Sequence, residues 1–178
     1  MIAGSASLPL HAADAVSNTS AEKVLPLNQR MAKKSPEWLS RGIMYQINPR
    51  AYTPEGTLKA AEAKLKDLAD LGMTIVYLCP VFVADDDMNR EFWSPRQKKS
   101  QMDSPLNPYR MKDFYHVDPE YGTDADLKSY VDTAHKLGLR VMLDMVYLHC
   151  GPTAVLIDKN PNIVKRNKDG KIITGPWK

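Results

Sequence analysis

The sequence contains no run of about 18 consecutive apolar residues, the length that a transmembrane helix needs. It also lacks an excess of charge of one sign, because its 24 Lys and Arg residues and 21 Asp and Glu residues are interspersed and leave a net charge of +3. No concentrated basic face is predicted, so binding to nucleic acid or to an anionic membrane has little support. We therefore expect no membrane span and no nucleic-acid partner.

Cysteine is scarce as well, since Cys79 and Cys150 are the only 2 cysteines among 178 residues. Two cysteines without metal-ligand spacing cannot form a metal framework, so the sequence predicts no metal site. Both lie at the ends of predicted strands. They are either free buried thiols or, if the protein is exported, a disulfide.

The first part of the chain, residues 1–37, is irregular and predicts a disordered leader ahead of a domain at residues 38–178. Small residues at positions 11–15 resemble the end of a secretory signal, although the positive and apolar segments of such signals are missing or incomplete. The alternative is therefore a degraded or mis-started signal peptide. That alternative favours a periplasmic or extracellular location.

Apolar segments rich in β-forming residues predict three strands, at residues 42–47, 73–79 and 139–146. Apolar residues spaced by three and four predict two helices between them, at residues 57–71 and 123–137. Gly72 and Gly138 follow these helices and suit their ends, and Thr123 with Asp126 resembles a capping box in which Asp replaces Glu.

Alternating strands and helices predict right-handed βαβ units and a parallel sheet, in which the second strand is buried on both faces and the third is also buried. Residues 81–121 interrupt this alternation with charged residues and prolines, and predict a long polar loop or subdomain after the second strand. No glycine-rich phosphate loop follows the first strand, which argues against a dinucleotide-binding fold. Periodicity alone leaves a barrel and a doubly wound sheet both open.

Parallel α/β folds bind ligands at the carboxyl ends of their strands, which directs attention to residues 79–82, the region of Tyr109, Asp144 and His149. A carboxylate within the third strand needs an arginine partner, a ligand or water, so Asp144 is either a core ion pair or a site residue. Tyr109 and Tyr115 offer flat faces for a sugar ring or pack as anchors. His149 follows the strand end and is a further candidate.

Two segments together resemble a known family. The stretch Asp144-Met145-Val146-Tyr147-Leu148-His149 resembles the first signature of the α-amylase family of glycoside hydrolases, Asp-x-Val-x-Asn-His, at the end of the third barrel strand. Residues 107–123 are similar to the family segment Gly-Tyr-Asp-x-x-Asp-Tyr-x-x-Ile-Asp-Pro-x-Phe-Gly-Thr. The resemblance covers about residues 38–178 and implies the first three βα units of a (β/α)8 TIM barrel, incomplete here.

The resemblance implies an enzyme that acts on α-linked glucans or related glucosides with a retaining mechanism. By matched position, Tyr109 stacks on the sugar, His149 hydrogen-bonds its hydroxyls, and Asp144 is the supporting acid that pairs with an arginine beside the nucleophile. Two positions depart from the family. Leu148 replaces the asparagine that commonly ligates a structural calcium, so no cofactor is expected, and Arg110 stands where many relatives carry aspartate, a change that points to altered substrate preference.

Retaining cleavage needs two carboxyl groups about 5 to 5.5 Å apart. In this family they follow later strands, and no segment here resembles those motifs, so we expect no catalytic residue in this chain and no turnover by it alone. Hydrolase and transglycosylase parents remain undistinguished. A non-catalytic carbohydrate-binding or partner-complemented half-barrel is the second hypothesis, and a different enzyme that uses Asp144 or His149 directly in acid/base chemistry is the third.

Overall fold

The computed structural model describes residues 25–93, 95–100 and 107–173. The chain divides into two units, Met1–Ser35 and Pro36–Lys178. Most of the expected leader, residues 1–24, lies outside the described residues, and with it the segment that resembles a signal peptide. In the described part of the first unit, η1 (Leu27–Gln29) is a 3-10 turn.

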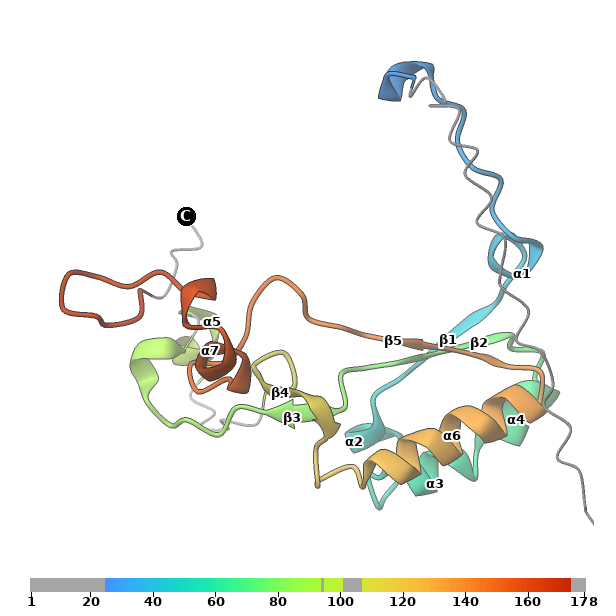
Figure 1. Cartoon of the computed structure of the whole chain (residues 1–178). Helices are drawn as coiled ribbons and strands as arrows, with labels where there is room; N and C mark the ends of the chain where they lie inside the picture. Colours follow the sequence, from blue (N-terminus) through green and yellow to red (C-terminus); the bar gives the residue numbers. More distant parts are fainter. Residues whose placement is uncertain (1–24, 94, 101–106, 174–178) are drawn as a thin grey trace, which may run out of the picture. The chain divides into compact units, whose positions relative to one another are not determined.

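The second unit is organised around a three-stranded parallel sheet, as predicted (Figure 1). Its strands are β1 (Met44–Ile47), β2 (Ile75–Leu78) and β5 (Arg140–Leu143), with β2 in the middle. The register pairs Ile47 with Leu78 and Leu78 with Leu143, so the three carboxyl ends are level.

Burial on both faces is confirmed for β2 alone among these strands. On the outer strand β1, the side chains of Met44 and Tyr45 are 46% and 37% exposed. An outer strand has one neighbour within the described residues, so its other side is not covered. The third strand was also expected to be buried, and this prediction is wrong for β5, whose residues are half-buried or exposed.

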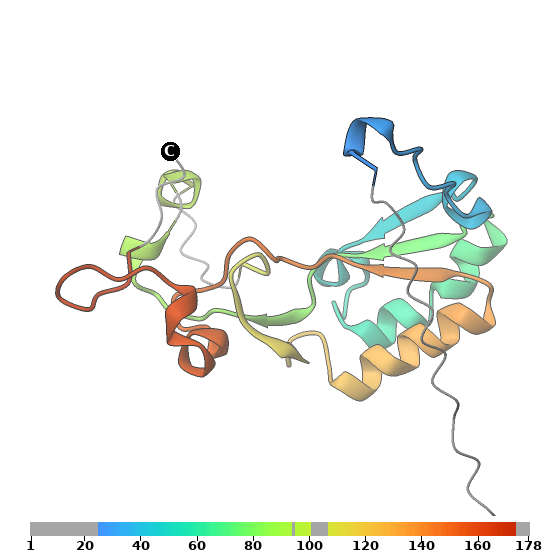
Figure 2. The same ribbon diagram turned by 45° about the horizontal axis from the view of Figure 1, so that its top comes forward.

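Helices cover one face of the sheet (Figure 1, Figure 2). They are α3 (Leu58–Glu62), α4 (Leu65–Asp70) and α6 (Asp124–Lys136). The single helix predicted at residues 57–71 is thus wrong, because the amide of Lys64 bonds to the carbonyl of Ala61, three residues back, at 3.1 Å. This tighter turn separates α3 from α4. Leu71, expected on the apolar face, is 69% exposed.

The hydrophobic core lies between the helices and this face of the sheet. Its buried members are Ile47, Leu58, Ala61, Leu65, Leu68, Val76, Leu78, Val81, Val117, Tyr121, Tyr130, Ala134 and Leu139. Gly72 and Gly138 have positive φ values of 90° and 79° and end α4 and α6 as predicted. No helix within the described ranges has the length and apolar character needed to cross a bilayer.

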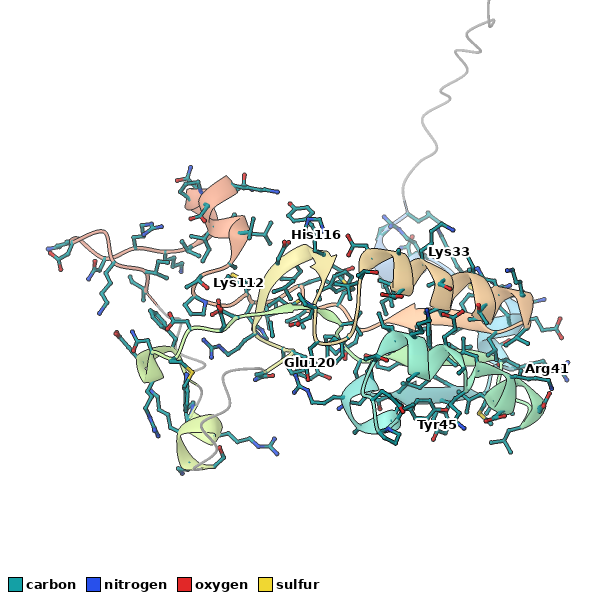
Figure 3. All side chains as sticks on the ribbon, turned by 90° about the horizontal axis from the view of Figure 1, so that it is seen from below. Lys33, Arg41, Tyr45, Lys112, His116 and Glu120 are labelled. Carbon is teal, nitrogen blue, oxygen red and sulfur yellow. The ribbon has the colours of Figure 1, made fainter. Side chains whose placement is uncertain are left out.

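The segment between β2 and α6 forms an antiparallel pair rather than a plain loop. β3 (Phe82–Ala84) pairs with β4 (Met111–Val117), and η2 (Arg90–Phe92) and α5 (Pro95–Lys99) lie between them in sequence. Figure 3 labels Lys112 and His116 on β4. The expected subdomain is therefore present, but its ends are not polar, because Val81, Val117 and Tyr121 belong to the main core.

Short elements complete the unit. They are α1 (Glu37–Ser40), α2 (Pro49–Tyr52), α7 (Val155–Lys159) and η3 (Pro161–Ile163). Arg50 in α2 donates two hydrogen bonds of 2.6 Å to Glu120, which ties the turn after β1 to the segment that precedes α6. Cys79 and Cys150 are free, half-buried thiols, and burial raises the pKa of Cys150.

The predicted capping box begins α6. The Thr123 hydroxyl accepts from the amide of Asp126 at 3.2 Å, and the Asp126 carboxylate accepts from the amide of Thr123 at 2.8 Å. The same carboxylate also accepts from the Thr123 hydroxyl at 2.6 Å. Two amides that have no partner within the helix are thereby satisfied.

Replacing Thr123 by alanine removes the cap and is expected to lower the free energy of unfolding by about 1 kcal/mol. Lys128→Ala is the matched control on the same helix, since Lys128 is exposed and pairs with Asp132 on the surface, a contact worth less than about 0.5 kcal/mol. Urea unfolding followed by circular dichroism measures both. Equal losses in the two variants would contradict the assignment of the cap.

Candidate functional site

Asp144 lies immediately after β5, at the carboxyl end of the sheet. Its amide donates to the carbonyl of Leu78 at 2.9 Å and continues the parallel ladder. Because side chains alternate along a strand, Asp144 shares the face of Met142, and Val141 and Leu143 pack on the helices. The carboxylate therefore points to the face away from the helices, where it is half-buried.

Tyr109 reaches this carboxylate from the segment before β4. Its hydroxyl donates to Asp144 Oδ2 at 3.0 Å, and its ring is 41% exposed. The amide of Tyr109 donates to Asn107 Oδ1 at 3.0 Å, which fixes the turn that carries the ring. Burial and the adjacent carboxylate raise the pKa of Tyr109 to about 12.

A second tyrosine, Tyr77, approaches the carboxylate from the middle strand. Tyr77 is paired with Met142 in the register, on the same face as Asp144. Burial, and to a lesser extent the nearby Asp144 carboxylate, raise the pKa of Tyr77. Among the described residues, the Asp144 carboxylate thus accepts from the Tyr109 hydroxyl, and it lies past the strand end and not within the core.

His149 joins the group through the backbone of Tyr109. Its Nε2 lies 2.7 Å from the Tyr109 carbonyl oxygen. A carbonyl can only accept, so Nε2 carries a proton in this contact. The structure therefore brings together Tyr109, Asp144 and His149, the three residues selected from the sequence, at one end of the sheet.

Two further residues selected from the sequence, Cys79 and Tyr115, make other contacts. Cys79 follows β2, and its sulfur accepts a hydrogen bond from Gln46 Nε2 at 3.3 Å, on the face of the sheet away from the helices. Tyr115 is on β4, where Lys159 Nζ lies 3.9 Å from its ring centre. The Tyr115 ring is exposed and contacts Lys159 of α7, so Tyr115 is not part of the group around Asp144.

Asp85 was not selected from the sequence, yet its side chain is fully buried. It follows β3 and faces Arg110, whose Nη2 lies 3.6 Å from Asp85 Oδ1. Arg110 is 7% exposed, so its side chain turns into the subdomain and away from solvent. A run of three acidic residues indicates a solvated loop, and only the apolar residues before it, such as Ala84, signal burial.

Comparison with known proteins identifies the family of the chain. The sequence model of the catalytic domain of alpha amylase matches residues 14–169. The chain belongs to the alpha-amylase family. The predicted family and the predicted fold, the first part of a TIM barrel that is not closed, are thereby confirmed.

Curated relatives within the alpha-amylase family include a malto-oligosyltrehalose trehalohydrolase of Deinococcus radiodurans, 35% identical over 62% of this chain and 16% of the relative. A cyclomaltodextrinase of Geobacillus thermopakistaniensis is 29% identical over 66% of this chain and 21% of the relative's length. A maltogenic alpha-amylase of Bacillus acidopullulyticus is 26% identical over 82% of this chain and 25% of its own. The chain thus spans about a quarter or less of the length of these relatives.

Solved structures of the alpha-amylase family share the fold of this chain. The match to an alpha-amylase from Lactobacillus plantarum covers 78% of this chain and 31% of that protein, with 32% identity and a TM-score of 0.65. An alpha-amylase from Geobacillus thermoleovorans, complexed with acarbose, matches 71% of this chain and 28% of its own with 26% identity and a TM-score of 0.51.

Replacing Asp144 by asparagine is expected to lower the pKa of Tyr109 from about 12 towards its ordinary value, because tyrosinate no longer forms beside a carboxylate. NMR of ¹³C-labelled tyrosine, with the Tyr109 signal assigned from Tyr109→Phe, measures this shift. Asp86→Asn is the control, since Asp86 pairs with Lys112. An unchanged Tyr109 titration in Asp144→Asn would contradict the observed contact.

Proposed function

We propose that this chain is the N-terminal part of the catalytic barrel of a retaining glycoside hydrolase that acts on α-linked glucans or related glucosides. The observation that carries the proposal is the convergence of Tyr109, Asp144 and His149 at the carboxyl end of the parallel sheet. This end is where barrel enzymes bind their substrates. The names of the matched relatives, which include a cyclomaltodextrinase and a maltogenic alpha-amylase, support the substrate class.

Within this proposal the three residues hold the sugar. The half-exposed ring of Tyr109 offers a flat face for stacking, and Asp144 fixes the direction of its hydroxyl. His149 is exposed beside it and hydrogen-bonds sugar hydroxyls. Asp144 is the supporting acid, and its half-buried carboxylate is available to an arginine beside the nucleophile.

We propose further that these 178 residues alone do not break the glycosidic bond. Retaining cleavage uses two carboxyl groups about 5 to 5.5 Å apart, one as nucleophile and one as acid/base. The Asp144 carboxylate accepts a hydrogen bond from the Tyr109 hydroxyl, which supplies neither role. The bond-breaking carboxylates are supplied from outside these residues.

The exposed outer strand favours one alternative, a half-barrel completed by another chain. Ile43 and Met44 at β1 are 53% and 46% exposed, which is unusual for apolar residues of a barrel strand. Glucan binding without turnover, together with a stable complex of two chains, favours this alternative over a segment of a single longer enzyme.

Tyr109→Ala and His149→Ala are each expected to weaken the binding of acarbose by about tenfold, or ~1.4 kcal/mol. Tyr115→Ala is the control, because Tyr115 is an exposed aromatic residue that contacts Lys159 and not Asp144. Isothermal titration calorimetry of the purified chain measures all three. Equal affinity in Tyr109→Ala and the unaltered chain would contradict the proposed stacking role.

The same purified chain is expected to release no reducing sugar from maltotriose. Turnover that co-purifies with the chain, and that is lost in Asp144→Asn, would overturn the proposal that the bond-breaking groups lie elsewhere. Turnover that persists in this variant would indicate a contaminating hydrolase.

We also propose that the calcium common in the family is not bound at Leu148. Its alkyl side chain, 78% exposed, offers no oxygen to a hard cation. Among the described residues, no three His, Cys, Asp or Glu side chains gather in a way that suits a metal ion. The side chain at position 148 therefore does not fit that ion.

Treatment with EDTA is accordingly expected to leave the thermal unfolding midpoint of the chain unchanged, within about 1 °C, since no bound cation is removed. Differential scanning calorimetry with and without added calcium chloride measures this. A fall of several degrees that calcium restores would show that another set of ligands holds the ion.

A further inference from the structure

We infer that Asp85 is a positioning residue for the sugar site, because its buried carboxylate fastens the segment after β5 to the β3–β4 pair. The inference rests on the proposed function of Tyr109 and His149. Asp85 acts through the two chain segments that carry them.

The first attachment is to the segment that follows His149. Asp85 Oδ2 accepts from the amide of Thr153 at 2.8 Å and from the Thr153 hydroxyl at 2.9 Å. These two bonds come from one residue, four positions beyond His149. The carboxylate thus holds both the backbone and the side chain of this segment.

The second attachment is to the segment that carries Tyr109. The amide of Asp85 donates to the carbonyl of Arg110 at 2.6 Å, and Arg110 Nη2 lies 3.6 Å from Asp85 Oδ1. The same Nη2 donates to the carbonyl of Asp87 at 3.2 Å, and Oδ1 accepts from the amide of Asp87 at 2.9 Å. Since Arg110 follows Tyr109 directly, its fixed side chain also fixes the backbone of Tyr109.

Gly151 allows the two segments to approach this closely. A Cβ at this position would lie 2.1 Å from Asp85 Oδ2, closer than real Cβ contacts permit. The amide of Gly151 donates to the carbonyl of Met111 at 2.7 Å. Backbone of the loop therefore lies directly against β4, and glycine is required there for its lack of a side chain.

Asp85 and Arg110 form a buried pair of opposite charges. Asp85 is fully buried and Arg110 is 7% exposed, so neither charge has access to much water. Removing one partner leaves the other charge buried without compensation, which is strongly unfavourable. Loss of Asp85 is therefore expected to move Arg110 and release the Thr153 segment, and both changes reach the contact between His149 Nε2 and the Tyr109 carbonyl.

Two variants and a matched control test the inference on the full chain. Asp85→Asn replaces one carboxylate oxygen by an NH2 group, which cannot accept hydrogen bonds from the donors around Asp85. Thr153→Val is milder, because it removes the hydrogen bond of the Thr153 hydroxyl and keeps that of the Thr153 amide. Asp86→Asn is the control, because the neighbouring Asp86 is exposed and pairs with Lys112 at 2.7 Å. Both Asp86 and Asp85 follow β3, and Figure 3 labels Lys112 on β4.

Each variant is examined by acarbose titration and by ¹⁵N NMR of the His149 ring, which reports the Nε2-protonated tautomer without any ligand. Asp85→Asn and Thr153→Val are expected to weaken acarbose binding by roughly three- to tenfold and to shift His149 towards a mixture of tautomers. Asp86→Asn is expected to change neither. A role confined to stability would lower the unfolding midpoint and leave the tautomer of the folded chain as it is.

Unchanged affinity and tautomer in Thr153→Val would overturn the inference, and this variant is decisive if Asp85→Asn does not fold. If the unaltered chain does not bind acarbose, the proposed function fails. The tautomer then still decides whether Asp85 positions His149, so the two failures are distinguishable.

Discussion

Parallel pairing of β2 with its two neighbours is the constraint on which the candidate site depends. The ladder continues one residue past the strand ends, where the amide of Cys79 bonds to Ile47 and the amide of Asp144 bonds to Leu78, at 2.8 and 2.9 Å. A slip of one residue would turn Asp144 towards the helices and place a carboxylate in the core. The apolar side chains that pack on α3, α4 and α6 thus also hold the register that directs the polar residues the other way.

The two faces of the sheet consequently have different chemistry. The helical face is closed by aliphatic and aromatic side chains, whereas Gln46, Tyr77 and Asp144 lie towards the other face, close to the carboxyl ends. The β3–β4 pair then brings Tyr109 to the same end, although Tyr109 is distant from Asp144 in the sequence. The parallel sheet thus supplies Asp144, and the β3–β4 subdomain supplies Tyr109.

Local patterns predicted the elements that depend on local physics. The strands, the glycine ends of the helices and the capping box of Thr123 and Asp126 follow from short-range preferences, and the structure contains all of them. The break between α3 and α4 was not predictable from spacing, because the apolar positions Leu58 and Leu65 fit a continuous helix equally well.

Non-local contacts account for what the sequence did not predict. β4 has no regular alternation of polar and apolar residues, and its register with β3 shifts twice, so the pairing was not visible in the sequence. The burial of Asp85 depends on Thr153 and Gly151, far along the chain. Tyr109, Asp144 and His149 were selected by their places near predicted strand ends and given roles by the family resemblance, and their mutual contacts became visible only in the fold.

The long insertion between β2 and β5 also bears on how the chain folds. Before these strands pair, the chain must close a loop that contains the whole β3–β4 subdomain and α6, and closing such a loop costs conformational entropy before any contact compensates for it. Structure formed early within the loop shortens its effective length. We therefore expect α6 and the β3–β4 pair to form first, and the pairing of β2 with β5 to limit the rate of folding.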